Sequence, residues 1–288
     1  MHILKIDIDL KANYLSRSIL KGLSILLVTL LSSCQSNVRP VSLPDGLRAE
    51  KIVTSSHQHF LVKQFQPNRT LDLHVYIEGD GTPWIARYVM AKDPTPRYPL
   101  LLGAMQRDKQ DSLYLGRPCY FNHVELGIAD AHCSAILWTG ARYSDAVVTS
   151  MVEALRTTLA ASPLYARVTL IGHSGGGTLA MLMAARMPEV TQLVTIAANL
   201  DVDAWTEGHH FSRLNESLNP AEIIKVATPA KQLHFGGALD TQVPNAPVQK
   251  FLATINQQLI VFPEQDHGNW DFVWPKILQA IEAQSRAP

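Results

Sequence analysis

The sequence lacks an excess of charge of either sign. Its 288 residues include 25 Lys and Arg and 25 Asp and Glu, so the formal net charge at neutral pH is zero. A chain without a positive field has no general attraction for the phosphates of DNA or RNA, and we therefore expect no nucleic-acid partner. The sequence also shows no repeat and no low-complexity tract, which excludes solenoid and fibrous architectures.

Motifs for cofactors and metals are missing as well. No Gly-x-Gly-x-x-Gly fingerprint occurs, and the stretch from Gly172 to Thr178 lacks the lysine of a phosphate-binding loop. There is no His-Glu-x-x-His motif and no pair of Cys-x-x-Cys motifs, so we expect neither a metal ion nor a cofactor. Apolar side chains, in contrast, make up 47% of the sequence and suffice for a large buried core.

The N-terminal segment has only a short hydrophobic run, Leu23 to Leu31, which follows several basic residues. About nine residues are too few to span a bilayer, which needs roughly twenty, but they suit the core of a signal peptide. The run ends in Leu31-Ser32-Ser33-Cys34, which resembles the lipobox of bacterial lipoproteins. The resemblance implies cleavage before Cys34, acylation of that residue and export to the cell envelope. Gln35 favours the outer membrane, facing the periplasm.

We therefore divide the chain into a signal peptide (1–33), a tether (34–48) and one folded domain (49–288). An ordinary secretory signal with an unmodified cysteine is the alternative for the first segment. The two other cysteines, Cys119 and Cys133, lie in a polar, turn-rich stretch of the domain. Because exported proteins commonly form disulfides, we expect a bond between them that closes a loop of about 14 residues. Two separate thiols are the alternative.

Strand and helix patterns alternate through the folded domain. Apolar and β-branched runs predict strands at 60–65, 71–77, 112–115, 168–171, 192–197, 232–235 and 258–262. Helical patterns cover residues 99–105, 144–160, 178–187, 246–257 and 272–283. This alternation favours an α/β fold in which a mostly parallel sheet is covered by helices on both faces. In such sheets the chemistry lies at the carboxyl ends of the strands.

The most informative stretch joins the strand at 168–171 to the following helix through Gly172-His173-Ser174-Gly175-Gly176. Gly-x-Ser-x-Gly between a strand and a helix is the pattern of a nucleophile elbow. The tight turn strains the backbone of the serine and requires small residues on both sides. The helix directs its positive end at the serine. Ser174 is therefore the candidate nucleophile, and a glycine-rich turn with an incidental serine is the alternative.

The elbow and the polar loops after the later strands resemble the α/β-hydrolase family over roughly residues 55–285. This family places its acid and then its histidine after the nucleophile in the chain. Asp240 follows one of the later strands here, and His267 follows the last one. The resemblance implies an α/β-hydrolase fold and a catalytic triad of Ser174, Asp240 and His267.

Other acids and histidines are weaker candidates. Asp201 and Asp203 follow the preceding strand, a position that some family members use for the acid. Asp266 is adjacent to the candidate histidine, but neighbouring side chains diverge, so it is a poor orienting group. His209 and His210 lie in an irregular stretch and suit the surface or the lining of a substrate site.

The resemblance also implies an oxyanion hole with two backbone N–H donors. One donor is Gly175, directly after the nucleophile. The other belongs to the turn after the strand at 71–77, with Asp80 as the first choice and Gly81 as the second. Relatives carry His-Gly at this turn, whereas this chain has Glu78. The identity of the second donor therefore stays open.

Two further features surround the expected site. Arg142 stands in a turn-rich stretch and suits either a substrate carboxylate or the fixing of a loop. The residues after the strand at 192–197 include Trp205, His210 and Phe211, and their number predicts a small cap over the serine. A surface position for these three side chains is the alternative.

Together these patterns predict a lipid-anchored, exported serine hydrolase. It would cleave carboxylic esters or related acyl bonds of a small molecule through an acyl-enzyme, with the membrane as a partner through the anchor. A peptidase, amidase or acyltransferase would use the same triad. A non-catalytic lipoprotein that keeps the fold as a binding module is the alternative from another class, although it would have no need for Ser174, Asp240 and His267 together.

Overall fold

The computed structural model describes residues 43, 47–68, 70–86, 88–121, 130–162, 165–224 and 230–286. The expected signal peptide, the expected lipidation site Cys34 and most of the expected tether lie outside these residues. Within the described part of the chain, no helix has the length and apolar character that crossing a membrane requires.

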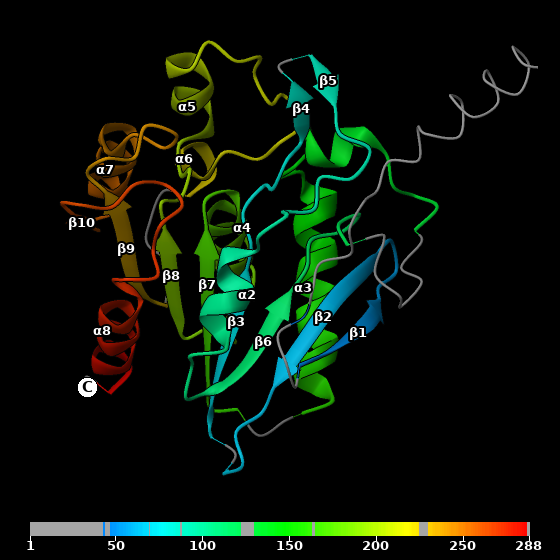
Figure 1. Cartoon of the computed structure of the whole chain (residues 1–288), viewed down its shortest axis with the longest axis vertical. Helices are drawn as coiled ribbons and strands as arrows, with labels where there is room; N and C mark the ends of the chain where they lie inside the picture. The colour runs from blue at the N-terminus through cyan, green and yellow to red at the C-terminus, as the bar shows by residue number, and fades with distance from the viewer. Residues whose placement is uncertain are drawn as a thin grey trace, which may run out of the picture. The chain divides into compact units, whose positions relative to one another are not determined.

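The centre of the domain is an eight-stranded sheet in the order β1-β2-β6-β3-β7-β8-β9-β10 (Figure 1). Its strands are β1 (Arg48–Val53), β2 (Gln58–Gln64), β3 (Asp72–Ile77), β6 (Asp111–Leu115), β7 (Arg167–His173), β8 (Gln192–Ile196), β9 (Lys231–Gly237) and β10 (Leu259–Phe262). The pairs β1–β2 and β2–β6 are antiparallel, and all other neighbours are parallel. The prediction of a mostly parallel sheet in an α/β fold is confirmed.

Helices cover both faces of this sheet. They are α2 (Leu100–Met105), α3 (Asp145–Ala160), α4 (Gly175–Ala184), α5 (Val202–Gly208), α6 (Pro220–Ile223), α7 (Asn245–Thr254) and α8 (Trp274–Arg286), with a 3-10 turn η1 (Ala135–Trp138). In Figure 1, α2 crosses in front of the sheet and α3 runs behind it. Along β3, Leu73 and Val75 belong to the core cluster that contains α3 and α4, whereas Tyr76 belongs to the cluster with α2 and α8. This period of two gives the sheet two apolar faces.

Some elements differ from the sequence patterns. β1 is an edge strand with the sequence RAEKIV, and its charged, half-exposed residues give no apolar run from which to predict it. The stretch around His209 and His210, which the sequence predicts to be irregular, contains α5 and α6 instead, and these helices form the predicted small cap region. Residues 135–138 form a 3-10 turn before α3, and Ser144 caps α3 by accepting a hydrogen bond from the Val147 N–H.

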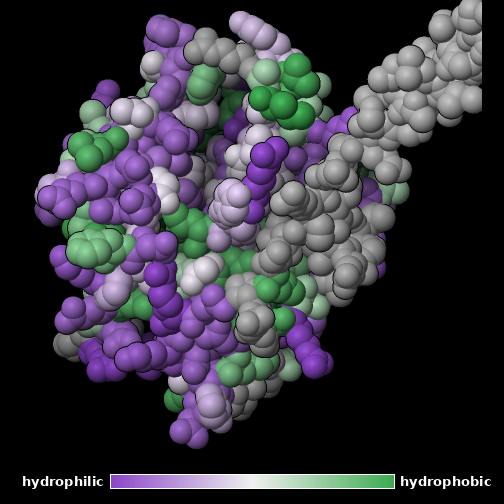
Figure 2. Space-filling view, viewed as in Figure 1, coloured by the Kyte–Doolittle hydropathy of each residue, from purple (hydrophilic) through white to green (hydrophobic). Residues whose placement is uncertain are grey.

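The connection between β3 and α2 leaves the sheet at the edge to which the arrowheads of β7, β8 and β9 point (Figure 1). It contains the two-stranded hairpin of β4 (Trp84–Ala86) and β5 (Val89–Met90). The large hydrophobic side chains of this hairpin are exposed: Trp84, Ile85, Tyr88, Val89 and Met90. Figure 2 shows green, hydrophobic residues gathered over this hairpin. This connection begins with the expected oxyanion turn.

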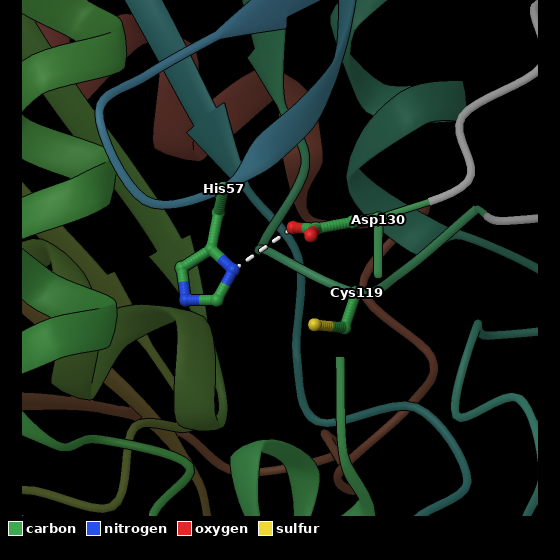
Figure 3. Close-up of side chains that lie close together, drawn as sticks. All are labelled: His57, Cys119 and Asp130. Carbon is green, nitrogen blue, oxygen red and sulfur yellow. Dashed lines mark hydrogen bonds and ion pairs between the residues drawn. The ribbon is translucent and has the colours of Figure 1, made fainter. Parts of the chain in front are cut away.

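The expected disulfide is present, because Cys119 and Cys133 are bonded with a Cα–Cα distance of 5.4 Å. Cys119 also belongs to a group of metal-ligand side chains with His57 and Asp130, the one such group among the described residues (Figure 3). A thiolate is the form of cysteine that binds metals, and the disulfide removes it. The imidazole Nδ1 of His57 and the Asp130 carboxylate instead pair with each other at 2.9 Å.

Candidate active site

Ser174 occupies the turn between β7 and α4 with a φ of 52° and a ψ of −126°. Such a positive φ is strained for a residue with a side chain. The turn is also tightly packed: a Cβ on Gly172 would collide with the Gly176 carbonyl group, and a Cβ on Gly176 would collide with the carbonyl oxygen of Ile77. Both positions therefore require glycine, and the serine side chain stands at the carboxyl end of the central strand.

Three predicted site residues come together at this edge of the sheet. The Nε2 atom of His267 lies 3.0 Å from Ser174 Oγ, and its Nδ1 atom lies 2.8 Å from Asp240 Oδ2. The second carboxylate oxygen of Asp240 accepts hydrogen bonds from the N–H groups of Gln242 and Val243, each at 2.8 Å. The Asp240 side chain is fully buried and that of His267 is 12% exposed. Loops after β7, β9 and β10 thus form one continuous hydrogen-bonded chain.

The backbone of His267 is held by two neighbouring side chains. His173 Nε2 donates to the His267 carbonyl oxygen at 2.8 Å, and Trp270 Nε1 donates to the same oxygen at 3.0 Å. Burial, together with the nearby His267, lowers the pKa of His173 to about 4. His173 is therefore neutral near pH 7 and carries its proton on Nε2, which fixes the position of the candidate base.

The turn of Gly79 and Asp80 packs directly on the elbow. A Cβ on Gly79 would lie 3.2 Å from Ser174 Cβ, and the space beside Gly175 is filled by the Asp80 carboxylate. No described group accepts a hydrogen bond from the backbone N–H of Gly175, Asp80 or Gly81. These N–H groups are therefore available to an external acceptor.

The Asp80 side chain is anchored by three partners. Its Oδ1 atom accepts a hydrogen bond from Arg117 Nη1, and its Oδ2 atom accepts from Arg142 Nη1 at 2.9 Å and from the Tyr143 hydroxyl at 2.6 Å. The Tyr120 hydroxyl donates to the Asp80 carbonyl oxygen at 3.0 Å. Burial alone would raise the pKa of Asp80, but Arg117 and Arg142 hold it well below its usual range. The turn therefore carries a permanent anion between two cations.

Arg142 serves this anchor rather than standing free in the site. Besides its bond to Asp80, its Nε atom donates to the Thr139 carbonyl oxygen at 2.8 Å. Of the two roles that the sequence left open, the contacts support the fixing of a loop. Arg142 is also one wall of the pocket above Ser174.

Glu78 is the first residue of this turn, where the resemblance stated above implies a histidine. Its carboxylate is buried and accepts hydrogen bonds from the Leu101 N–H at 2.9 Å and from the Gly79 N–H at 3.3 Å. Burial raises the pKa of Glu78 to about 7, although these two hydrogen bonds oppose the rise. The side chain links the first turn of α2 to the turn that contacts Ser174.

The alternative acids are used elsewhere. Asp201 caps α5, because its Oδ1 atom accepts a hydrogen bond from the Ala204 N–H at 3.1 Å, and Asp203 lies in the first turn of the same helix. Asp266 accepts hydrogen bonds from two N–H groups of its own loop. Among the described carboxylates, only Asp240 pairs with the candidate base His267.

The cap region carries an aromatic cluster, of which Trp205 lines the pocket over Ser174, whereas Phe211 is 51% exposed. Trp205 and Phe211 have ring centroids 5.3 Å apart, and His209 stacks on Phe211 at 5.2 Å. Trp205 Nε1 and His209 Nε2 both donate to the Gln242 carbonyl oxygen, at 2.7 and 2.9 Å. The cap is thereby tied to the acid loop. His210 forms part of the turn that ends α5, with a positive φ of 55°.

A pocket of about 320 Å³ opens over the candidate nucleophile. Its walls come from the oxyanion turn, the hairpin connection, the cap and the histidine loop: Glu78, Gly79, Asp80, Gly81, Pro96, Tyr98, Leu100, Arg142, His173, Ser174, Trp205, Gln242, Val243, His267 and Gly268. A second hollow of about 210 Å³ shares Trp205 and Val243 with it. The volume of the pocket over Ser174 is at the lower end of the range for small-molecule sites, about 300–1,000 Å³.

No pattern in the sequence predicts that Arg117, Tyr120 and Tyr143 hold the turn. Arginines are mostly exposed in proteins, but the Arg117 side chain is 2% exposed. A sequence does not distinguish a buried arginine from a surface one. The sequence offers one indication of this role: Arg117 and Tyr120 lie on either side of Cys119, which was expected to form a disulfide.

Comparison with known proteins places this geometry in a known fold. No protein-family model and no curated protein matches the chain. Solved structures are similar, among them an esterase from Pyrococcus furiosus (TM-score 0.58, 13% identity, 86% of this chain and 92% of that one). An α/β-hydrolase candidate of unknown function from Agrobacterium tumefaciens has a TM-score of 0.56 and 12% identity, over 83% of this chain and 96% of that one. The acylaminoacyl peptidase from Pyrococcus horikoshii has a TM-score of 0.55 and 12% identity, over 82% of this chain and 42% of that one. The chain therefore has the α/β-hydrolase fold, which serine hydrolases share.

Proposed function

We propose that this protein is a serine hydrolase that cleaves carboxylic esters or related acyl bonds through an acyl-enzyme. The observation that carries the proposal is the hydrogen-bonded chain from Ser174 through His267 to Asp240, with distances of 3.0 and 2.8 Å, at a strained elbow that faces a pocket. These distances are within the range for proton transfer between a nucleophile and a base.

In the first half-reaction, Ser174 Oγ attacks the acyl carbonyl carbon while His267 Nε2 takes the hydroxyl proton. The carbonyl oxygen becomes an oxyanion that accepts hydrogen bonds from the N–H groups of Gly175 and Asp80, with Gly81 as the alternative donor. The bond to the leaving group then breaks, and His267 returns the proton to the leaving oxygen or nitrogen. An acyl-Ser174 ester remains.

In the second half-reaction, water replaces the serine hydroxyl as nucleophile. His267 takes a proton from the water, the hydroxide oxygen bonds to the acyl carbon, and the bond to Ser174 Oγ breaks as His267 protonates it. Asp240 accepts a hydrogen bond from the Nδ1–H group throughout and is not itself protonated, which keeps Nε2 free as a base and stabilises the imidazolium. The two N–H groups that donate to its other oxygen keep Asp240 oriented.

Activity-based labelling tests this assignment. A fluorophosphonate probe is expected to label the wild type, and Ser174→Ala is expected to lose both the label and the hydrolysis of a short-chain p-nitrophenyl ester. Ser150→Ala is the matched control, because Ser150 also pairs with a histidine, His59 Nε2 at 2.7 Å, but is fully buried and does not line the pocket over Ser174. Equal labelling of the wild type and Ser174→Ala would remove the proposal.

A second experiment tests the chemical class of the substrate. The pocket volume of about 320 Å³ favours a small acyl group and leaving group over a folded polypeptide. Matched p-nitrophenyl esters and p-nitroanilides with the same acyl chain compare esterase with amidase activity. We expect faster turnover of the ester, because its leaving group needs less protonation by His267.

We also propose that the protein is exported and lipid-anchored at Cys34, in the outer membrane and facing the periplasm. The sequence Leu31-Ser32-Ser33-Cys34 supports the anchor, and the Cys119–Cys133 disulfide is typical of an oxidising compartment. Detergent phase partitioning of the native protein tests the anchor. The wild type is expected in the detergent phase and Cys34→Ala in the aqueous phase, whereas identical partitioning would contradict lipidation.

A further inference from the structure

We propose that the segment of residues 116–121 is a positioning element for the oxyanion hole, and that the Cys119–Cys133 disulfide keeps it in place. In this arrangement Arg117 and Tyr120 are positioning residues that act through Asp80. The inference rests on the proposed function, since it concerns the same N–H donors.

Two contacts join the segment to the turn, one on each side of the half-cystine. Arg117, two residues before Cys119, binds the Asp80 carboxylate and donates through Nη2 to the Arg142 carbonyl oxygen at 2.8 Å. Tyr120, the next residue after Cys119, binds the Asp80 carbonyl oxygen. The guanidinium of Arg117 also lies 5.0 Å from the centre of the Tyr120 ring. The side chain and the main chain of Asp80 are thus both held from this segment.

The backbone of the segment is in a conformation that it would not keep without support. Cys119 and Phe121 both have positive φ angles, 70° and 62°, which residues with side chains rarely adopt. On the far side, the Phe121 ring stacks on Phe60 at 4.3 Å and its N–H donates to Thr95 Oγ1 at 2.6 Å. On the near side, the covalent bond of Cys119 supplies the restraint.

The other end of the disulfide is fixed to the sheet. The turn before Cys133 begins at Asp130, whose carbonyl oxygen accepts the Cys133 N–H at 3.1 Å. The Asp130 carboxylate binds His57 Nδ1 at 2.9 Å and the Gln58 N–H, the first residue of β2, at 3.2 Å (Figure 3). The disulfide therefore connects the Arg117–Tyr120 pair to a buried anchor at the start of β2.

This arrangement matters for catalysis because an oxyanion hole requires accurate placement of its donors. A shift of a few tenths of an ångström at Asp80 weakens a hydrogen bond that forms fully only in the transition state. Loss of the support is therefore expected to lower kcat and to leave KM nearly unchanged. A purely structural role for the segment would lower the folded fraction without this split.

Tyr120→Phe is the sharpest test, because it removes one hydroxyl and keeps the ring. We expect kcat for a p-nitrophenyl ester to fall about 10-fold, with KM within about twofold, since a supporting group costs less than the 10²–10³ of a lost donor. The inhibition constant of a trifluoromethyl ketone, whose adduct places an oxyanion in the hole, is expected to rise by a similar factor. Tyr76→Phe is the control, because its buried hydroxyl binds Asp108 and not the turn.

The Cys119→Ser/Cys133→Ser double variant tests the contribution of the disulfide. Its activity is measured at a temperature at which circular dichroism shows that the variant is folded. We expect the same fall in kcat as in Tyr120→Phe, and faster amide hydrogen exchange at residues 79–81 in both. Unchanged kcat and exchange in both variants, with an active wild type, would overturn the inference. A wild type that is neither labelled nor active would instead remove the proposed function, while the exchange measurement would still decide whether the segment holds the turn.

Discussion

The groups on the two sides of Ser174 are held in place by different kinds of contact. On one side, Asp240 is held by the backbone of its own loop, through the N–H groups of Gln242 and Val243. The His267 carbonyl oxygen accepts hydrogen bonds from the side chains of Trp270 in its own loop and of His173 at the end of β7. On the other side, the turn of Glu78 to Gly81 is held by side chains from distant segments.

The sequence distances show the contrast. Gln242 and Val243 lie two and three residues from Asp240, whereas the partners of Asp80 lie 37, 62 and 63 residues away. A loop that is held by its own backbone keeps its shape through local geometry. A turn that is held by charged groups depends on the packing of the whole domain, because each buried charge must keep its partner. The Asp240 loop is therefore expected to tolerate loss of global stability better than the turn of Glu78 to Gly81.

The largest effect is expected on the acid and base side. Asp240→Asn removes the acceptor that fixes the Nδ1 proton of His267, and kcat is expected to fall by about 10³–10⁴. Steady-state hydrolysis of a p-nitrophenyl ester measures this loss. Asp266→Asn is the matched control, because Asp266 binds only N–H groups of its own loop, and its activity is expected within about twofold of the wild type. A comparable loss in the control would reassign the acid.

The second largest effect is the pH dependence of stability that Glu78 is expected to cause in the turn beside Ser174. Because the pKa of Glu78 is raised from 4.5 to about 7, the folded chain binds its proton more tightly than the unfolded chain does. The contribution of Glu78 to stability is therefore greatest below pH 4.5 and is lost progressively as the pH rises to about 7. The neighbouring His173, 3.9 Å away, is neutral over most of this window because burial lowers its pKa to about 4.

Glu78→Gln removes this dependence. Relative to the variant, the wild type is expected to lose up to roughly 3 kcal/mol of unfolding free energy between pH 4.5 and 7. Urea unfolding at several pH values measures the difference between the two curves. Parallel curves would show that the Glu78 carboxyl has the same proton affinity in the folded and unfolded chain.

The third effect tests the covalent support of the oxyanion side. The disulfide closes a loop with a sequence separation of 14 residues. Its removal in Cys119→Ser/Cys133→Ser is expected to lower the unfolding free energy by about 3 kcal/mol, measured by urea unfolding. Wild type treated with a reductant provides the comparison, and a stability equal to that of the oxidised protein would contradict a restraining role.

The smallest effect separates Asp240 from its rival. Asp201→Ala removes the N-terminal cap of α5 and is expected to lower the unfolding free energy by about 1 kcal/mol. Ester hydrolysis is expected to stay within about twofold of the wild type, because the carboxylate that binds His267 is that of Asp240 and not that of Asp201. A large loss of kcat at unchanged stability would restore Asp201 as a candidate acid.

These two sides also differ in what could be predicted. The elbow at Ser174 and the loops of Asp240 and His267 follow strands with clear apolar patterns, and the structure brings the three residues together. Arg142 was left between two roles, because sequence spacing does not show that its partner is Asp80. β1 was not predicted, because an edge strand with charged side chains has no apolar signal.

By itself, the sequence determined the alternation of the main strands and helices, the glycine-lined elbow and the candidate residues behind the strands, because these depend on side-chain periodicity and on the sterics of short turns. Only the tertiary structure decided how the oxyanion turn is held. The partners of Asp80 are Arg117, which follows β6, and Arg142 and Tyr143, which precede α3. The sequence does not show that these segments meet, and the free energy of a buried ion pair depends on which groups surround it in space.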